Sequence, residues 1–181
     1  MNNYIYHLKP EPFQGNKLVP LTHMDKNSPL YKEHAKKYSG REELMNEKIP
    51  FLDCKWNDVV QFSALDPQII VNELAKLQPD LKLMRPFYFK AHIRDVLEQA
   101  DAVIYEKKER FSKDFKIQES EARPLDGNNY YEIKKVPKNT KDYWQKAITE
   151  KRKVLWFPFV PHILVKGALD VSSFEICQLK I

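Results

Sequence analysis

The sequence predicts a protein of the α+β class, built from short strands and short helices that follow one another irregularly. Several runs rich in β-branched and aromatic residues, such as residues 59–65, are too short for helices. Helical periodicity follows Ser-Pro and Asp-Pro pairs, which are typical of capped helix starts. These elements lack the regular strand–helix–strand spacing of a parallel sheet. The 181 residues, of which 43% are hydrophobic, are expected to form one domain over residues 1–181.

Each element has a local reason. In a strand at residues 3–8, alternation places Tyr6 on one face and His7 on the other. Ser28 and Asp66 each precede a proline, an arrangement that caps the first turn of a helix. The further elements expected are a strand or extended connection at 17–21, a helix at 41–48, strands at 59–65, 81–90 and 102–105, and helices at 92–100 and from Asn139 or Thr140 onward.

The C-terminal part, residues 153–181, is the most apolar stretch of the chain. Its β-branched and aromatic run at 157–165 predicts a strand. Pro158 and Pro161 cannot donate to a ladder, so the first half of this strand is expected at a sheet edge or a bulge. The continuous apolar run at residues 163–165 indicates a strand covered on both faces. The chain then closes with a turn at 170–173 and a last strand at 174–181.

Residues 107–139 form a polar stretch of mixed charge without a sustained period. Gly127-Asn128-Asn129 is typical of a turn. We therefore expect a long surface excursion with one hairpin at 115–133.

Composition excludes several classes of protein. No apolar run approaches the roughly 20 residues that span a bilayer, and no signal peptide is visible, so a cytoplasmic protein is expected. Cys54 and Cys177 are too few for a disulfide scaffold. The five histidines show no metal-binding spacing, so no metal site is expected. The net charge of +5 permits a nucleotide or nucleic acid as partner without requiring one.

Two places could carry chemistry. His162 lies where a predicted strand emerges from an edge, and is either a reactive side chain or a satisfied, partly buried imidazole. Trp56, Asn57 and Asp58 combine an indole, an amide and a carboxylate, which could line a base or nicotinamide pocket. The alternative is that Trp56 anchors the core and Asn57 belongs to a turn.

Three pairs of lysines recur along the chain, each flanked by acids and aromatics. The pairs are Lys36-Lys37, Lys107-Lys108 and Lys134-Lys135. Such pairs are typical of a solvated surface. A nucleic-acid-binding surface would require them to converge in space.

Taken in order, several segments resemble the ADP-ribosyltransferase fold. The resemblance is to the bacterial toxin-type enzymes that modify DNA bases and, more distantly, to the RNA 2′-phosphotransferases. It covers about a third of the chain. It is carried by the segments Tyr4-Ile5-Tyr6-His7-Leu8, Tyr38-Ser39-Gly40-Arg41-Glu42, the stretch 59–67 and the stretch 162–176. The resemblance implies a split sheet of mixed or antiparallel strands with short flanking helices, a cleft, and NAD as cofactor.

The chain departs from this family at the catalytic glutamate, where His162 or Pro161 stands instead. A neutral histidine could accept a proton as a base, and a protonated one could bind a phosphate. The resemblance implies His162 and Arg41 as catalytic residues, with Arg41 on a pyrophosphate. The cofactor-binding residues that it implies are His7, Tyr6, Ser63, Trp56 and Asn57.

Three functions follow as alternatives. The first is NAD-dependent transfer of ADP-ribose to a nucleic acid or a protein. The second is a non-catalytic domain that binds a nucleotide or nucleic acid, which the missing glutamate favours. The third is a protein-interaction domain whose aromatic residues fill the core. Whether His7, Arg41 and His162 meet in one cleft distinguishes the first from the second. A largest pocket far from all three would indicate the third.

Overall fold

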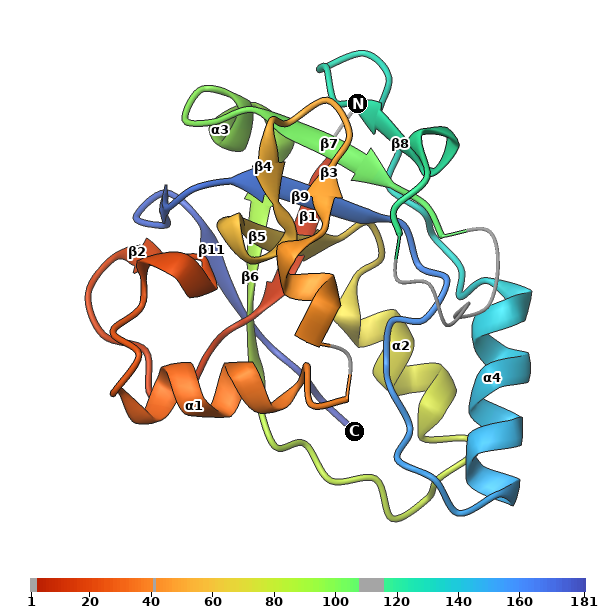
Figure 1. Ribbon diagram of the computed structural model, residues 1–181. Coiled ribbons are helices and arrows are strands. Elements are labelled where there is room, and N and C mark those ends of the chain that lie inside the picture. Colours follow the sequence, from red (N-terminus) through yellow and green to blue (C-terminus); the bar gives the residue numbers. More distant parts are fainter. Residues whose placement is uncertain (1–2, 41, 108–115) are drawn as a thin grey trace.

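Figure 1 shows the computed structural model, which describes residues 3–40, 42–107 and 116–181. Its centre is a seven-stranded antiparallel sheet with few helices, so the α+β prediction is confirmed. The strand order is β11-β6-β1-β5-β9-β7-β8. In chain order these strands are β1 (Tyr4–Leu8), β5 (Val59–Ser63), β6 (Phe87–His92), β7 (Ala102–Tyr105), β8 (Ala122–Pro124), β9 (His162–Lys166) and β11 (Glu175–Gln178).

Shorter elements surround this sheet. Two small strand pairs join β2 (Lys17–Leu18) to β10 (Leu169–Asp170) and β3 (Lys48–Ile49) to β4 (Cys54–Lys55). The α-helices are α1 (Pro29–Lys36), α2 (Pro67–Leu74), α3 (Ile93–Leu97) and α4 (Lys138–Thr149). The 3₁₀ turns are η1 (Leu21–His23), η2 (Glu42–Asn46), η3 (Trp56–Asp58) and η4 (Glu119–Glu121). Figure 1 places α1 toward the sheet end where β6 begins, and α3 at the opposite end.

The large sheet is nearly divided in two between β1 and β5. These strands share one register position, Tyr6 with Ser63, whereas β1 pairs with β6 along its whole length. On the other side, β5 pairs with β9 along its whole length as well. The sheet therefore consists of a three-stranded half, β11-β6-β1, and a four-stranded half, β5-β9-β7-β8.

Alternation along the strands builds a core on each face of the sheet. In β1, Ile5 enters one cluster with Phe62 and Phe89, whereas Tyr6 faces the other side with Tyr88. In β9, Ile163 belongs to the first cluster and Leu164 to the opposite one, and both are 0% exposed. The prediction that residues 163–165 are covered on both faces is therefore confirmed.

The predicted helix caps are present where the capping residue supplies a side-chain oxygen. The Ser28 hydroxyl accepts from the Tyr31 amide at 3.0 Å, and the Asp66 carboxylate accepts from the Gln68 amide at 2.8 Å. The cap predicted for α4 was wrong, because this helix begins at Lys138 after Pro137. Thr140 instead lies inside the helix, fully buried. The helix predicted at 41–48 is the 3₁₀ turn η2 among the described residues.

Residues 107–139 differ from the expected surface excursion. Within the described part, β8 pairs with β7, and Ile133 forms a parallel bridge with Leu65, so the predicted hairpin at 115–133 was wrong. Tyr130 is 1% exposed, and its hydroxyl donates to the Tyr4 carbonyl at 2.6 Å. Apolar side chains within a polar stretch thus attach this segment to the sheet.

Two predicted strands begin later than expected, and prolines explain both. The strand predicted at 81–90 starts at Phe87, directly after Pro86. The strand predicted at 157–165 starts at His162, directly after Pro161. A proline donates no ladder hydrogen bond, so the preceding residues form loops instead.

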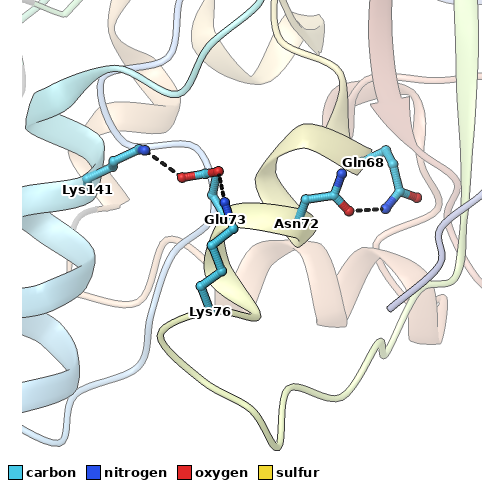
Figure 2. Close-up of polar contacts among 5 residues, drawn as sticks. All are labelled: Gln68, Asn72, Glu73, Lys76 and Lys141. Atoms are coloured by element: carbon cyan, nitrogen blue, oxygen red, sulfur yellow. Dashed lines mark hydrogen bonds and ion pairs between the residues drawn. The ribbon is translucent and has the colours of Figure 1, made fainter.

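Helices α2 and α4 pack together and share an ion-pair network. Trp144 of α4 lies in one apolar cluster with Ile70 and Leu74 of α2. Figure 2 shows Glu73 of α2 between Lys76, which follows the end of this helix, and Lys141 of α4, each at 2.5 Å. The hydrogen bonds from these two lysines lower the pKa of the Glu73 carboxyl to about 2.

This network predicts a pH-dependent contribution to stability. Glu73→Gln is expected to lower the free energy of unfolding at pH 7 by about 1 kcal/mol, the upper range for a solvated ion pair. Because the folded pKa lies below the ordinary value of 4.5, the wild-type advantage is complete above that value. It should shrink as the pH falls from about 4.5 toward about 2.

Urea unfolding of both proteins across this pH range checks the prediction. Glu98→Gln at the exposed end of α3 is the matched control and should change stability little at any pH. A Glu73→Gln penalty that stays constant down to pH 2 would contradict the role of the carboxylate.

Candidate functional site

A cavity of about 320 Å³ lies against the four-stranded half of the sheet. Its floor comes from Gln61 of β5, His162 of β9 and Tyr105 of β7. Six aromatic side chains line it: Tyr38, Trp56, Tyr105, Trp156, Phe157 and Phe159. The volume is at the lower end of the range for small-molecule sites, about 300–1,000 Å³.

The loop before β9 forms one wall and is held in a fixed shape. Phe159 has a φ of +60°, in the left-handed region that a non-glycine residue rarely adopts. Hydrogen bonds on both sides hold it there. The buried Thr140 hydroxyl donates to the Pro158 carbonyl at 2.6 Å, and the Ala64 amide donates to the Pro161 carbonyl at 2.9 Å. Such backbone strain is frequent at ligand-binding sites.

Trp56 lines the cavity beside Tyr105. Their rings meet edge to face with centroids 5.6 Å apart, and Trp56 is only 9% exposed. The Trp56 indole N–H donates to the Tyr38 hydroxyl at 3.1 Å. Trp56 is therefore a core anchor and also lines the cavity. Its contact with a base or a nicotinamide stays a prediction.

His162 is partly exposed at the start of β9 and faces the cavity. Burial lowers its pKa to about 4, although a hydrogen bond to the Val160 carbonyl acts against this shift. The ring is therefore neutral at pH 7. Because one nitrogen must carry the proton given to that carbonyl, the other nitrogen can accept a hydrogen bond. His162 can thus bind a hydroxyl or an amine of a ligand.

Two lysines supply positive charge to the same cavity. Lys37 follows α1 and Lys107 follows β7, and both line the cavity. Partial removal from water lowers the pKa of Lys37, and the positive charges of Arg85 and Lys153 lower it further. None of the described residues that line the cavity is acidic.

His7 lies beside the cavity, at the place where β1 and β5 separate. Its Nδ1 donates to the backbone carbonyl of Gln61 at 2.7 Å, because a carbonyl can only accept. This side-chain bond joins the two strands where the ladder between them has ended. Burial lowers the pKa of His7 to about 4, and Lys37 and Arg85 lower it as well.

Three further residues predicted for the site are placed elsewhere. The Tyr6 hydroxyl donates to Glu132 at 2.5 Å, and burial and this carboxylate raise its pKa. The Ser63 hydroxyl is occupied by the amide and the carbonyl of Leu65. Asn57 follows Trp56 in η3 and is not among the lining residues. Arg41 lies outside the described residues.

Other lining residues were missed, although the sequence held a signal for them. Lys37 and Lys107 belong to lysine pairs interpreted as solvated surface, and the cavity is where they converge. Phe157 and Phe159 were assigned to a strand, and Trp156 directly precedes its predicted range. The two prolines among them indicate a loop, and an aromatic loop beside a sheet is a frequent element of binding sites.

Neither a metal centre nor a membrane span is found in the described part of the chain. No group of three or more His, Cys, Asp or Glu side chains could hold a metal ion there. No helix in that part is long and apolar enough to cross a bilayer. No family model, curated protein or solved structure matches this chain. The resemblance to the ADP-ribosyltransferase fold therefore stays a prediction.

The strained position gives a direct test of the loop geometry. Phe159→Ala and Phe159→Gly remove the same ring, but only glycine adopts a φ of +60° without steric cost. We expect the glycine variant to unfold with a free energy about 1 kcal/mol higher than the alanine variant. Denaturant titration of both variants measures the difference. Equal stabilities would mean that the left-handed conformation is not maintained.

Proposed function

We propose that the protein binds a nucleotide, with its base in the aromatic cavity and its phosphate near the lysines. The observation that carries this proposal is one cavity in which aromatic walls and two lysines meet, with no acidic residue among the described lining residues. Every base presents a π-face to aromatic side chains, and stacking contributes about 1–3 kcal/mol per base. Lysine binds phosphate as a point charge.

The size of the cavity limits the ligand. A volume of about 320 Å³ suits one nucleoside with its phosphate better than a whole dinucleotide. If NAD is the ligand, we expect one half of it to occupy the cavity and the other to extend outward. The neutral His162 ring would accept a hydrogen bond from a ribose hydroxyl or an exocyclic amine.

The second candidate function is NAD-dependent transfer of ADP-ribose, and the observation that favours it is the position of His162 in this cavity. In such a reaction the bond from ribose to nicotinamide breaks and a bond from ribose to the acceptor forms. His162 would take the proton of the acceptor. Its low pKa makes it a weak base, and no acidic residue among those described lines the cavity. We therefore favour binding without turnover.

A protein-interaction domain is the third candidate, and the cavity argues against it. Its distinguishing sign would be a largest pocket remote from the predicted site residues. The cavity described above contains His162 and Trp56, and Gln61 of its floor is bonded to His7, so a pocket is present at the predicted site residues.

Calorimetric titration with AMP, ADP-ribose and NAD tests the proposal. We expect binding to the wild type and roughly tenfold weaker binding to Phe159→Leu, which keeps an apolar side chain but removes the stacking surface. Tyr131→Leu is the control, because this tyrosine is 68% exposed and lies outside the cavity. Absence of binding for all three nucleotides, on protein shown to be folded, would refute the proposed function.

Release of nicotinamide from NAD separates the two candidates. Binding without release supports the favoured function. Release that is lost in His162→Ala, while the binding of ADP-ribose remains, would establish the transferase instead.

A further inference from the structure

A group of basic side chains lies beside the cavity, where α1 approaches the end of β1. His34 and Lys37 are three residues apart and so share a face at the end of α1. Arg85, in the connection before β6, bonds Glu33 of the same helix at 2.7 Å. His7 at the end of β1 is close enough to be affected by the charges of Lys37 and Arg85.

One atom of this group lacks a partner. The Nε2 atom of His34 is buried and has no hydrogen-bond partner among the described residues. Buried polar atoms almost always have a partner in the protein, an ordered water or an ion. Removal from water lowers the pKa of His34 to about 4, and Lys37 and Arg85 lower it further. The ring is therefore neutral, and its Nε2 can donate a hydrogen bond to an anion in one tautomer.

The electrostatic balance of the group also favours an anion. Arg85 and Lys153 each repel Lys37, and this repulsion contributes, after burial, to the lowered pKa of Lys37. The carboxylate of Glu33 offsets part of this repulsion. The Glu33 side chain is 53% exposed to solvent, however, whereas the Arg85 side chain is 21% exposed. A phosphate oxygen would relieve the repulsion and pair with a planar guanidinium, which matches phosphate geometry.

We infer that His34, Lys37 and Arg85 form a phosphate subsite continuous with the cavity, which takes the phosphate chain of a nucleoside diphosphate. Continuity follows from Lys37, which lines the cavity and also belongs to this group. It follows also from Gln61, which lines the cavity and whose backbone carbonyl accepts a hydrogen bond from His7. The inference rests on the proposed function for the nucleoside half of the ligand, and the phosphate half can be tested separately.

The first experiment compares adenosine, AMP, ADP and inorganic pyrophosphate by calorimetry. We expect ADP to bind at least tenfold more tightly than AMP, and pyrophosphate alone to bind weakly. Arg85→Gln should abolish the advantage of ADP over AMP while leaving the affinity for adenosine unchanged. Arg94→Gln is the matched control, because this exposed arginine lies on α3 at the opposite end of β6.

His34→Leu separates binding from folding. The change removes a buried nitrogen that has no partner in the described part of the chain, so we expect stability to be kept or increased. The affinity for ADP and pyrophosphate should nevertheless fall. In proton NMR of the wild type, pyrophosphate should shift the ring resonances of His34 but not those of His23, which is exposed on η1.

The outcomes distinguish the subsite from the cavity. Equal affinity for AMP and ADP, with pyrophosphate leaving the His34 resonances in place, would overturn the subsite and leave nucleotide binding intact. Binding of pyrophosphate without any binding of adenosine or AMP would support the subsite and refute the base-binding cavity. An advantage of ADP that survives both Arg85→Gln and His34→Leu would place the phosphate elsewhere and also overturn the inference.

Discussion

The separation of β1 from β5 is the constraint on which the rest of the structure depends. Their ladder is reduced to the pair Tyr6–Ser63, and beyond it the His7 imidazole bonds the Gln61 carbonyl in place of a backbone amide. A buried carbonyl without a partner is costly, so this side-chain bond allows the strands to part. The parting brings Gln61 to the cavity and leaves the end of β1 near the basic residues of α1.

A second constraint acts on the loop before β9. Pro158 and Pro161 prevent pairing, and Thr140 of α4 holds the Pro158 carbonyl, so the strained Phe159 backbone keeps one shape. A rigid aromatic wall costs little conformational entropy when a ligand binds, because its side chains are already ordered. The packing of α4 on α2 is thereby linked to the shape of the cavity, although neither helix lines it.

Histidines and cations differ in the same way at the cavity and in the basic group beside it. His7, His34 and His162 are all kept neutral, whereas the positive charge is concentrated on lysine and arginine side chains that water still reaches. A neutral imidazole supplies directional hydrogen bonds, and the cations supply attraction for a phosphate. This division of roles fits recognition of a nucleotide better than proton transfer, which requires a histidine of higher pKa.

The sequence by itself determined the α+β class, the alternating faces of β1, the caps at Ser28 and Asp66 and the two-sided burial of β9, because each depends on residues within a turn or a strand. It also singled out His162 and Trp56, since an isolated polar or large aromatic residue stands out in an apolar run. Only the tertiary structure decided that Lys37 and Lys107 meet at one cavity and that β8 pairs with β7. It also decided that Ser63 and Tyr6 are occupied elsewhere. These outcomes depend on contacts between residues far apart in the chain, whose geometry no local pattern contains.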